Sequence, residues 1–181
     1  ERAIAAVDKI SDKAPPGSVV GALNSEVAMR GEIVFIAVPY AGQAPTLQSL
    51  EPALTGKLVI TVVAPVIFNE GVATTIPVPE GSAALQAAAL LPNSRVAAAF
   101  HNVAARDLLR PPGSLESDVF VFSDDDRSKS EVANLTRLIP GTRPIDGGGL
   151  INARYAEDLT ALLMNINRIH KAHASIRITG L

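Results

Sequence analysis

The chain has 181 residues, of which 48% are hydrophobic and 19% are charged, and it contains no cysteine. At this length one domain can bury a core of its own without disulfides, and the lack of thiols excludes cysteine-based chemistry. The formal net charge is only -2, and no run of Lys or Arg could follow a phosphate backbone, which argues against a nucleic-acid partner. Apolar runs are too short to span a bilayer, so we expect a soluble, cytoplasmic protein with no membrane partner.

Short β-branched runs alternate with helical stretches rich in Ala and Leu, which is typical of an α/β sheet covered on both faces. Pro and Gly separate most of these segments and help to place their ends. In chain order, the pattern predicts a helix over 1–10, a strand over 18–23, a helix over 24–30, a strand over 32–38, a helix over 46–54, a strand over 57–63, a helix over 82–91, a strand over 95–100, a helix over 104–109, a strand over 118–122, a helix over 126–138, a strand over 143–146 and a helix over 150–170.

The last of these helices is the longest, and one side of it is strongly apolar. That side is formed by Ile151, Tyr155, Leu159, Leu162, Leu163, Ile166 and Ile169. The helix is longer than one usually needs to cover a sheet, so we expect it to pack against a second copy, in a homodimer or a higher homo-oligomer.

Ligands of open α/β sheets bind outside the carboxyl ends of the strands. The predicted loops there begin at Val38, Val63 and His101, and they are small, neutral and largely apolar. Such walls suit a flat uncharged ring better than a charged substrate, because they exclude water without adding a competing acid or base. The alternative, which these residues leave open, is that strand ends are apolar only because cores are.

No other pattern in the chain carries a convincing catalytic or metal signature. We find neither a Ser/His/Asp arrangement nor a carboxylate pair, and His170 and His173 lack a clear third metal ligand, so no metal is expected. The three carboxylates of 124–126 are better explained as favourable charges at the start of a helix. The three glycines of 147–149 do not match a phosphate-binding loop and indicate a tight turn.

Several stretches together resemble one family, the NADPH-dependent reductases of coenzyme F420. The His101 to Ala105 turn, combined with the later Ser-Asp-Asp-Asp and Arg-Pro-Ile-Asp segments, is the most specific part of the resemblance. The matching stretches are 36–40, 96–105, 123–126, 142–148, 159–168 and 176–180.

The resemblance implies a Rossmann-type parallel sheet with a helical C-terminal extension, and an enzyme that transfers a hydride between NADP and coenzyme F420. Residues 1–122 would be the remainder of the NADP-binding domain, and residues 123–181 would complete the F420 site and the dimer contact. Because the two cofactors carry the chemistry, no catalytic side chain is expected. The protein would bring nicotinamide C4 and deazaflavin C5 together in a dry slot.

The resemblance also implies which residues bind the cofactors. Arg2 would lie near the 2′-phosphate of NADP, with Val38, Pro39 and Gly42 along the same cofactor. The slot where the rings meet would be lined by Ala64, Pro65, His101, Asn102 and Ala105, with a backbone group near Ala174. Three arginines are possible contacts for the polyglutamate tail of the deazaflavin, namely Arg143, Arg154 and Arg168.

One departure from the family is large, because no glycine-rich turn and no first β-α-β unit precede the matching residues. Two strands would then be missing between 18–23 and 32–38, so we expect a gap in the sheet and expect this chain to be a fragment of a longer protein. Two other functions stay open. One is a non-catalytic remnant that acts as an interaction or dimerisation module, and the other is a related NADP-dependent reductase with a different electron partner.

Overall fold

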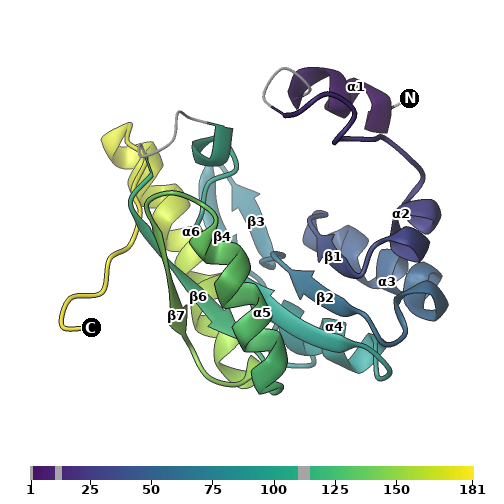
Figure 1. Ribbon diagram of the computed structural model, residues 1–181. Coiled ribbons are helices and arrows are strands. Elements are labelled where there is room, and N and C mark those ends of the chain that lie inside the picture. Colours follow the sequence, from purple (N-terminus) through teal and green to yellow (C-terminus); the bar gives the residue numbers. More distant parts are fainter. Residues whose placement is uncertain (1, 11–13, 110–114) are drawn as a thin grey trace.

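The computed structural model describes residues 2–10, 14–109 and 115–181, without the side chains of Arg2 and Ile4. Helices and strands alternate through most of the chain (Figure 1). The elements are α1 (Arg2–Ile10), α2 (Asn24–Arg30), β1 (Ile33–Ile36), α3 (Tyr40–Leu54), β2 (Leu58–Thr61), β3 (Val66–Asn69), β4 (Val72–Thr75), α4 (Ala83–Leu90), β5 (Arg95–Ala99), β6 (Ser117–Phe122), α5 (Asp126–Arg137), β7 (Thr142–Asp146) and α6 (Ala153–His170), with 3-10 turns at Asp107–Leu109 and Leu150–Asn152.

Five strands form one sheet in the order β1-β2-β5-β6-β7. Strands β1, β2 and β5 are parallel, β6 runs antiparallel to β5, and β7 is parallel to β6. The predicted α/β fold with a mostly parallel sheet and a C-terminal helix is therefore confirmed, and one antiparallel pair is added to it.

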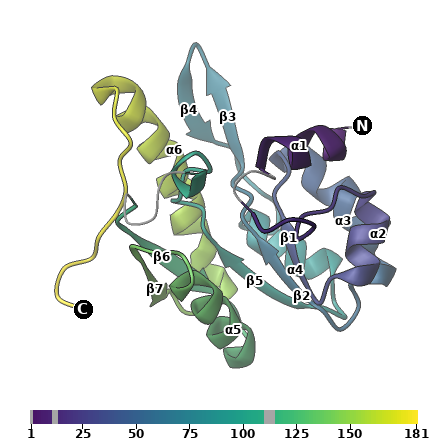
Figure 2. The ribbon, with the colours of Figure 1, turned by 45° about the horizontal axis from the view of Figure 1, so that its top comes forward.

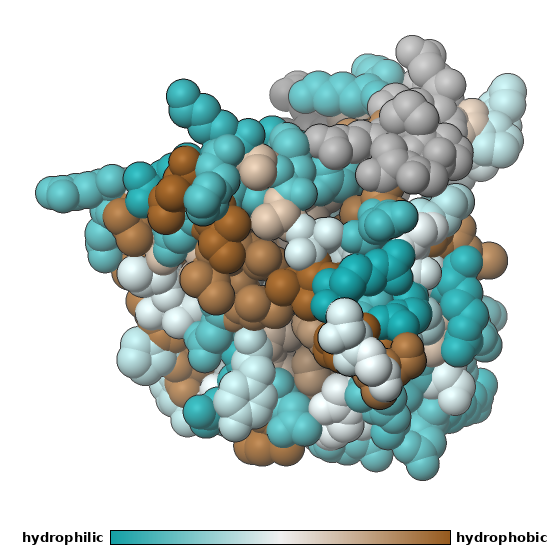
Figure 3. Space-filling view, turned by 90° about the vertical axis from the view of Figure 1, so that its left-hand side faces the viewer, coloured by the Kyte–Doolittle hydropathy of each residue, from teal (hydrophilic) through white to brown (hydrophobic). Residues whose placement is uncertain are grey.

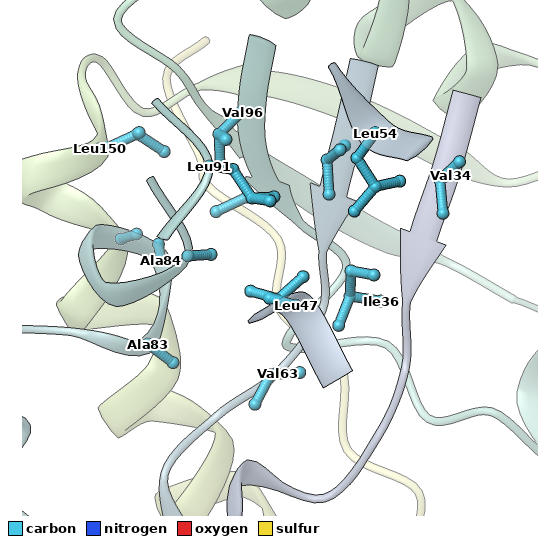
Figure 4. Packing of buried hydrophobic residues seen from close by; sticks show 14 of the residues in the cluster. Val34, Ile36, Leu47, Leu54, Val63, Ala83, Ala84, Leu91, Val96 and Leu150 are labelled. Carbon is cyan, nitrogen blue, oxygen red and sulfur yellow. The ribbon is translucent and has the colours of Figure 1, made fainter. Parts of the chain in front are cut away.

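Alternation along the strands sends side chains to two separate cores. On one face Val59, Val96 and Ala98 pack with residues of α3, α4 and the start of α6 (Figure 4). On the other face Ile60 and Ala97 pack with Val132 of α5. The strands have few polar positions because both of their faces are covered, as expected for parallel strands.

The predicted strand over 18–23 is wrong, and so is the predicted gap in the sheet. Residues 18–23 form no strand, and Val20 and Leu23 are 71% and 70% exposed. An isolated extended segment has no ladder to satisfy its backbone groups, so it gains nothing from strand geometry. The sheet begins at β1, whose Ile33 and Phe35 stay partly exposed, and it continues without interruption to β7.

Helix α3 begins at Tyr40 rather than at the predicted residue 46, and it contains both Pro45 and Pro52. Proline is normally read as a helix boundary because it removes one backbone hydrogen bond. Here the burial of the Gln43 and Leu47 side chains stabilises the first turns of α3 against the sheet, and this stabilisation exceeds the cost of the lost hydrogen bond.

The hairpin formed by β3 and β4 is absent from the prediction. Its two-residue turn places Glu70 at φ 49° and Gly71 at φ 81°, the left-handed pair expected of a type I′ turn. Figure 2 shows the hairpin projecting beside α6. The side chain of Asn165 in α6 makes two hydrogen bonds to the backbone of Ala73. It accepts from the Ala73 N–H at 2.9 Å and donates to the Ala73 carbonyl at 2.7 Å. The sequence signal was the glycine after Asn69 and Glu70, between two β-branched runs.

Helix α6 leaves part of its apolar side uncovered. Ile151 in the preceding turn, together with Tyr155, Leu162 and Ile169, is more than half exposed. Figure 3, which views the molecule from the side of the C-terminal tail, shows apolar side chains gathered into an area bordered by hydrophilic ones. Within the described residues, no helix combines the length and the hydropathy that crossing a bilayer requires.

Candidate functional site

The loops after β1, β2 and β5 lie at one edge of the sheet, because these three strands are parallel neighbours. Val38 and Pro39 follow β1, Ala64 and Pro65 follow β2, and His101 follows β5. The topology therefore brings together the residues that the sequence assigned to one site, at the edge where open α/β sheets bind ligands.

Helix α3 starts directly behind the loop after β1, with Pro39 as its N-cap. Gly42 lies in the first turn, where its N–H donates to the Pro39 carbonyl at 2.8 Å. A Cβ added to Gly42 would meet only Val38, at 3.8 Å, so packing inside the chain does not require glycine there. The N-terminus of α3 points its free N–H groups toward this edge and favours negative charge nearby.

A buried network of neutral groups fixes the loop after β2. The fully buried Gln43 accepts a hydrogen bond from Thr61 Oγ1 at 3.0 Å and donates to the carbonyl of Ala83 at 2.9 Å. Thr61 Oγ1 also accepts from the N–H of Val63 at 3.3 Å. The chain that leads to Ala64 is therefore held to α3 and α4 without any ionised group.

The chain leaves β5 through a strained residue. Phe100 has φ 66°, in the left-handed region that a bulky side chain rarely adopts, and its ring lies 6.0 Å from that of Phe35. Such strain persists only where the surroundings enforce it, and it is frequent at functional sites. Here it turns His101 back under the sheet edge.

His101 is 6% exposed, and within the described residues neither of its ring nitrogens has a hydrogen-bond partner. Burial lowers the pKa of His101 to about 4, so the imidazole is neutral near pH 7. Its backbone carbonyl accepts from Thr160 Oγ1 of α6 at 3.0 Å, which fixes the residue's position. A buried imidazole with unused donor and acceptor capacity fits a site completed by a ligand.

Asn102, also buried, links this loop to the other half of the molecule. Its side-chain amide donates to the carbonyl of Asp118 in β6 at 2.6 Å and to Ser117 Oγ at 3.3 Å. The Asn102 side chain is thus occupied within the protein and positions the loop against β6.

The Asp118 side chain is fully buried and carries an ionic cluster. Arg143 donates to both of its oxygens, at 2.9 and 2.7 Å, and Arg177 donates at 3.3 Å. The hydrogen bonds from Arg143 are the main reason that the pKa of Asp118 falls to about 2. The sequence analysis overlooked this residue, although an acidic residue inside a strand otherwise rich in apolar residues was a signal for a buried pair.

The cluster holds the C-terminal tail, residues 171–181, across β6. The N–H of Ile178 donates to Asp118 Oδ2 at 2.7 Å, and the Asp118 N–H donates to the carbonyl of Ile176 at 2.7 Å. Nearer to α6, the N–H of Ala174 donates to the Asn167 side chain at 2.5 Å. The backbone N–H at Ala174 is therefore engaged inside the protein, and the tail is placed beside the loop after β5.

Three cavities lie around these loops, and they are separate from one another. One of about 80 Å³ includes Val38, and one of about 240 Å³ includes Pro65 together with Glu157. A third, of about 510 Å³, lies between the hairpin, the loop after β5 and the start of the tail. The residues assigned to one slot share an edge of the sheet, but this conformation does not join their cavities into one.

Glu157 is a second buried acid that the sequence analysis did not single out. It reaches from α6 to the start of α4, where its two oxygens accept from the N–H groups of Ala83 and Ala84 at 2.9 and 3.0 Å. Desolvation raises the pKa of Glu157. This contact satisfies the first turn of α4 and is an example of favourable negative charge at a helix N-terminus.

The structure shows the surroundings of three of the four basic residues proposed to contact the cofactors. The side chain of Arg2 lies outside the described part of the chain. Arg143 is engaged by Asp118, and Arg154 lies 5.0 Å from the ring centre of Tyr155, whereas Arg168 is exposed on the last turn of α6. In the described ranges, no group of three or more potential ligands stands close enough to bind a metal ion.

The side chains at the strand ends are mostly small and neutral. The imidazole of His101 is neutral with unused hydrogen-bonding capacity, and the charged groups of the Asp118 cluster are satisfied within the protein. The cavity at Pro65 is different, because Arg154, Glu157 and Asp158 also line it.

Comparison with known proteins identifies the family. Residues 1–65 match the model of the family described as NADP oxidoreductase, coenzyme F420-dependent. The F420-dependent NADP reductase of Methanothermobacter marburgensis is 37% identical over all of this chain and 84% of its own length. The enzyme of the same name from Methanocaldococcus jannaschii is 30% identical over all of this chain and 82% of its own length.

Solved structures agree with this result. A putative F420-dependent NADP reductase from Arthrobacter sp. FB24 superposes with a TM-score of 0.78 at 26% identity, covering 87% of this chain and 74% of that chain. An imine reductase from Myxococcus stipitatus, solved with NADP+, shares only the fold, with a TM-score of 0.63 at 12% identity over 94% of this chain and 53% of that one. The chain belongs to the family of F420-dependent NADP reductases.

Proposed function

We propose that this protein transfers a hydride between NADPH and coenzyme F420. The observation that carries the proposal is the convergence, in a member of this family, of three small neutral loops at the carboxyl edge of parallel strands. The two cofactors supply the hydride chemistry, and the protein supplies binding, orientation and exclusion of water.

On the NADP side, Val38 and Pro39 lie along the cofactor, and the first turn of α3 faces its phosphates. The close approach of a ligand to Gly42 explains a glycine that internal packing does not require. Residues 1–122 form this half of the enzyme, and Arg2 lies toward the 2′-phosphate.

On the deazaflavin side, Ala64 and Pro65 form the floor where the rings meet, and Ala105 and the backbone near Ala174 form the far wall. His101 contributes a neutral imidazole whose ring nitrogens are free to bind a ring carbonyl or N–H. Asn102 acts through β6, because its amide already binds the Asp118 carbonyl. Residues 123–181 complete this half through α6 and the tail.

The test is to mix the full chain with NADPH and oxidised deazaflavin and to follow the deazaflavin absorbance. Reduction at a rate proportional to enzyme concentration supports the proposal. Reduction of a flavin in place of the deazaflavin would assign the protein to another branch of NADP-dependent reductases, and no reduction of either would reject hydride transfer.

We also propose that the protein works as a homo-oligomer, paired through the exposed side of α6. Tyr155, Leu162 and Ile169 recur there at helical spacing and remain more than half exposed. Leu162→Glu should shift the mass measured by light scattering from a multiple of the protomer to the protomer. Arg168→Glu, a change of charge at another exposed position of α6, is the matched control. A wild-type protein that is monomeric at high concentration would contradict the pairing.

A further inference from the structure

The cavity of about 510 Å³ is lined by side chains from three separate segments. Phe68 comes from the hairpin, Arg106 from the loop after β5, and Asn167 and Lys171 from the end of α6. Figure 2 shows the hairpin, the end of α6 and the start of the tail at the same end of the molecule. The cavity therefore lies just outside the loops that form the deazaflavin half of the site.

The cavity is positively charged along its rim. Arg106 and Lys171 are exposed, and within the described residues neither makes an ion pair or a side-chain hydrogen bond. Most other basic side chains near the sheet are paired, as Arg95 is with Glu131 and Arg143 with Asp118. Two such cations across one cavity, with no carboxylate among the described residues that line it, favour an anionic occupant.

One buried carboxylate lies near this cavity but is not among its described lining residues. Asp107 is 8% exposed, and its Oδ1 lies 3.8 Å from Nδ1 of His173. This contact also brings the loop after β5 next to the tail. Among the described lining residues, the lysine and arginine charges are those of Arg106 and Lys171.

Lys171 occupies a position where glycine would be favoured. It follows the last turn of α6 with φ 50°, and its N–H donates to the Asn167 carbonyl. A left-handed residue at a helix end is usually glycine because a Cβ is strained there. The Lys171 side chain is held at the cavity rim despite this strain.

The cavity is next to the proposed ring site in sequence. Arg106 is next to Ala105, and His173 is next to Ala174, and both of those alanines belong to the proposed deazaflavin wall. A group attached to the ring and leaving the slot in this direction would enter the cavity. Phe68 and Met164, 64% and 41% exposed, give it apolar sides for the linking carbons.

We propose that Arg106 and Lys171 bind the anionic side chain of the deazaflavin, through its phosphate or its glutamate carboxylates. This inference depends on the proposed function, since it assigns a subsite to the same substrate. The two residues act on affinity and not on the hydride step, because the cavity lies outside the slot where the rings meet.

The experiment compares three ligands that differ only in the side chain. They are the deazaflavin cut before the phosphate, the form with the phosphate alone, and the form with the phosphate and several glutamates. Binding to the full chain is measured by quenching of deazaflavin fluorescence at low and high KCl, and kcat and KM are measured in parallel. The variants are Arg106→Ala, Lys171→Gly and the double variant, with Arg30→Ala of α2 as the matched exposed arginine, which is outside the cavity lining and has no proposed cofactor contact.

Each single variant should raise Kd and KM for the glutamylated ligand about fivefold, which is the strength of a partly exposed charged contact. The Kd of the wild type for that ligand should rise with KCl, and the double variant should have lost most of this dependence. For the ligand cut before the phosphate, wild type and variants should agree, and kcat and the KM for NADPH should be unchanged. Lys171→Gly should keep the fold because it relieves a strained position.

The ligand with phosphate alone identifies which anion is bound. If it shows the full effect, the phosphate is the group held, and if it behaves as the shortest ligand does, the carboxylates are. Equal effects on all three ligands, or no effect on any, would overturn the subsite while leaving hydride transfer intact. A wild-type protein that binds and reduces none of the three would instead overturn the proposed function.

Discussion

The loop after β2 and the C-terminal tail both border the proposed site, but opposite kinds of interaction hold them. The loop is fixed by neutral hydrogen bonds from the buried Gln43 and Thr61. The tail is fixed by charges, through Asp118 and its two arginines. The loop is continuous with the core and needs only orientation, whereas the tail covers β6 with little apolar burial and needs a stronger anchor.

Removing the anchor of the tail should have the largest effect. In Asp118→Ala the two guanidinium groups lose their buried partner, and breaking such a pair costs about 3 to 5 kcal/mol of unfolding free energy. The variant should also raise the KM for the deazaflavin more than the KM for NADPH, because the tail borders the deazaflavin half. Chemical denaturation and steady-state kinetics measure the two effects.

Asp126→Ala is the control, since the Asp126 side chain is 96% exposed and forms a surface ion pair with Lys129 at 3.0 Å. It should change the unfolding free energy by less than about 1 kcal/mol. Equal losses in the two variants would contradict the special role given to the buried cluster.

The next effect is a pH dependence caused by His101. Its folded pKa of about 4 lies below the ordinary 6.5, so the unfolded state binds a proton more readily between these values. The full contribution of His101 to the free energy of unfolding is therefore present above pH 6.5. This contribution, about 3 kcal/mol in total, is lost as pH falls toward 4. His101→Phe should remove that part of the slope in unfolding free energy measured from pH 7 to 4. An identical slope in wild type and variant would show that the imidazole is not buried and neutral.

Breaking the neutral network should cost less. Gln43→Leu leaves the Thr61 hydroxyl and the Ala83 carbonyl without their partner, which should lower the unfolding free energy by about 2 kcal/mol. In contrast to Asp118→Ala, this change should raise both KM values, because Gln43 lies in α3 beside the proposed NADP half and holds the loop proposed to lie where the two rings meet. A change in only one of the two KM values would mean that this loop does not border both halves.

A smaller loss is expected where the hairpin is attached. Asn165→Ala removes both hydrogen bonds to the Ala73 peptide and should cost about 1 kcal/mol. Hydrogen exchange of the hairpin amides should become faster while exchange in β2 and β5 stays unchanged. Unchanged protection of Ala73 would show that α6 does not hold the hairpin.

The smallest effect belongs to a surface ion pair. Glu131→Gln removes the negative charge shared by Arg95 and Arg127, and since these groups are partly exposed, the cost should stay below about 1 kcal/mol. Its effect on both KM values should be negligible, because α5 lies on the face of the sheet away from the proposed site. A loss as large as that of Asp118→Ala would remove the contrast between buried and surface charge.

The sequence predicted most helices and most sheet strands, because their periodicity follows burial on one or both sides. It failed where long-range pairing decides the structure. Residues 18–23 have the composition of a strand but no neighbour to pair with, and the β3–β4 hairpin depends on Asn165, far along the chain. Likewise, the prolines of α3 suggested a later start because the burial of Gln43 could not be foreseen.

The candidate site was predicted in part. The strand-end residues could be grouped because parallel strands end at one edge, and the family resemblance then gave them roles. Asp118, Arg106 and Lys171 were not found, because their importance depends on which charges meet in space and which stay unpaired. Arg143 had been considered for the cofactor, but a buried carboxylate engages it instead.

The most direct test of the whole account is to follow the isotope from NADPH that carries deuterium at both C4 positions of the nicotinamide, in ordinary water. The account predicts that the deuterium is recovered at C5 of the reduced deazaflavin, since the two rings meet without an intervening proton donor. Deuterium lost to solvent, or a deazaflavin that remains oxidised beside oxidised NADP, would contradict direct transfer between rings held at the sheet edge.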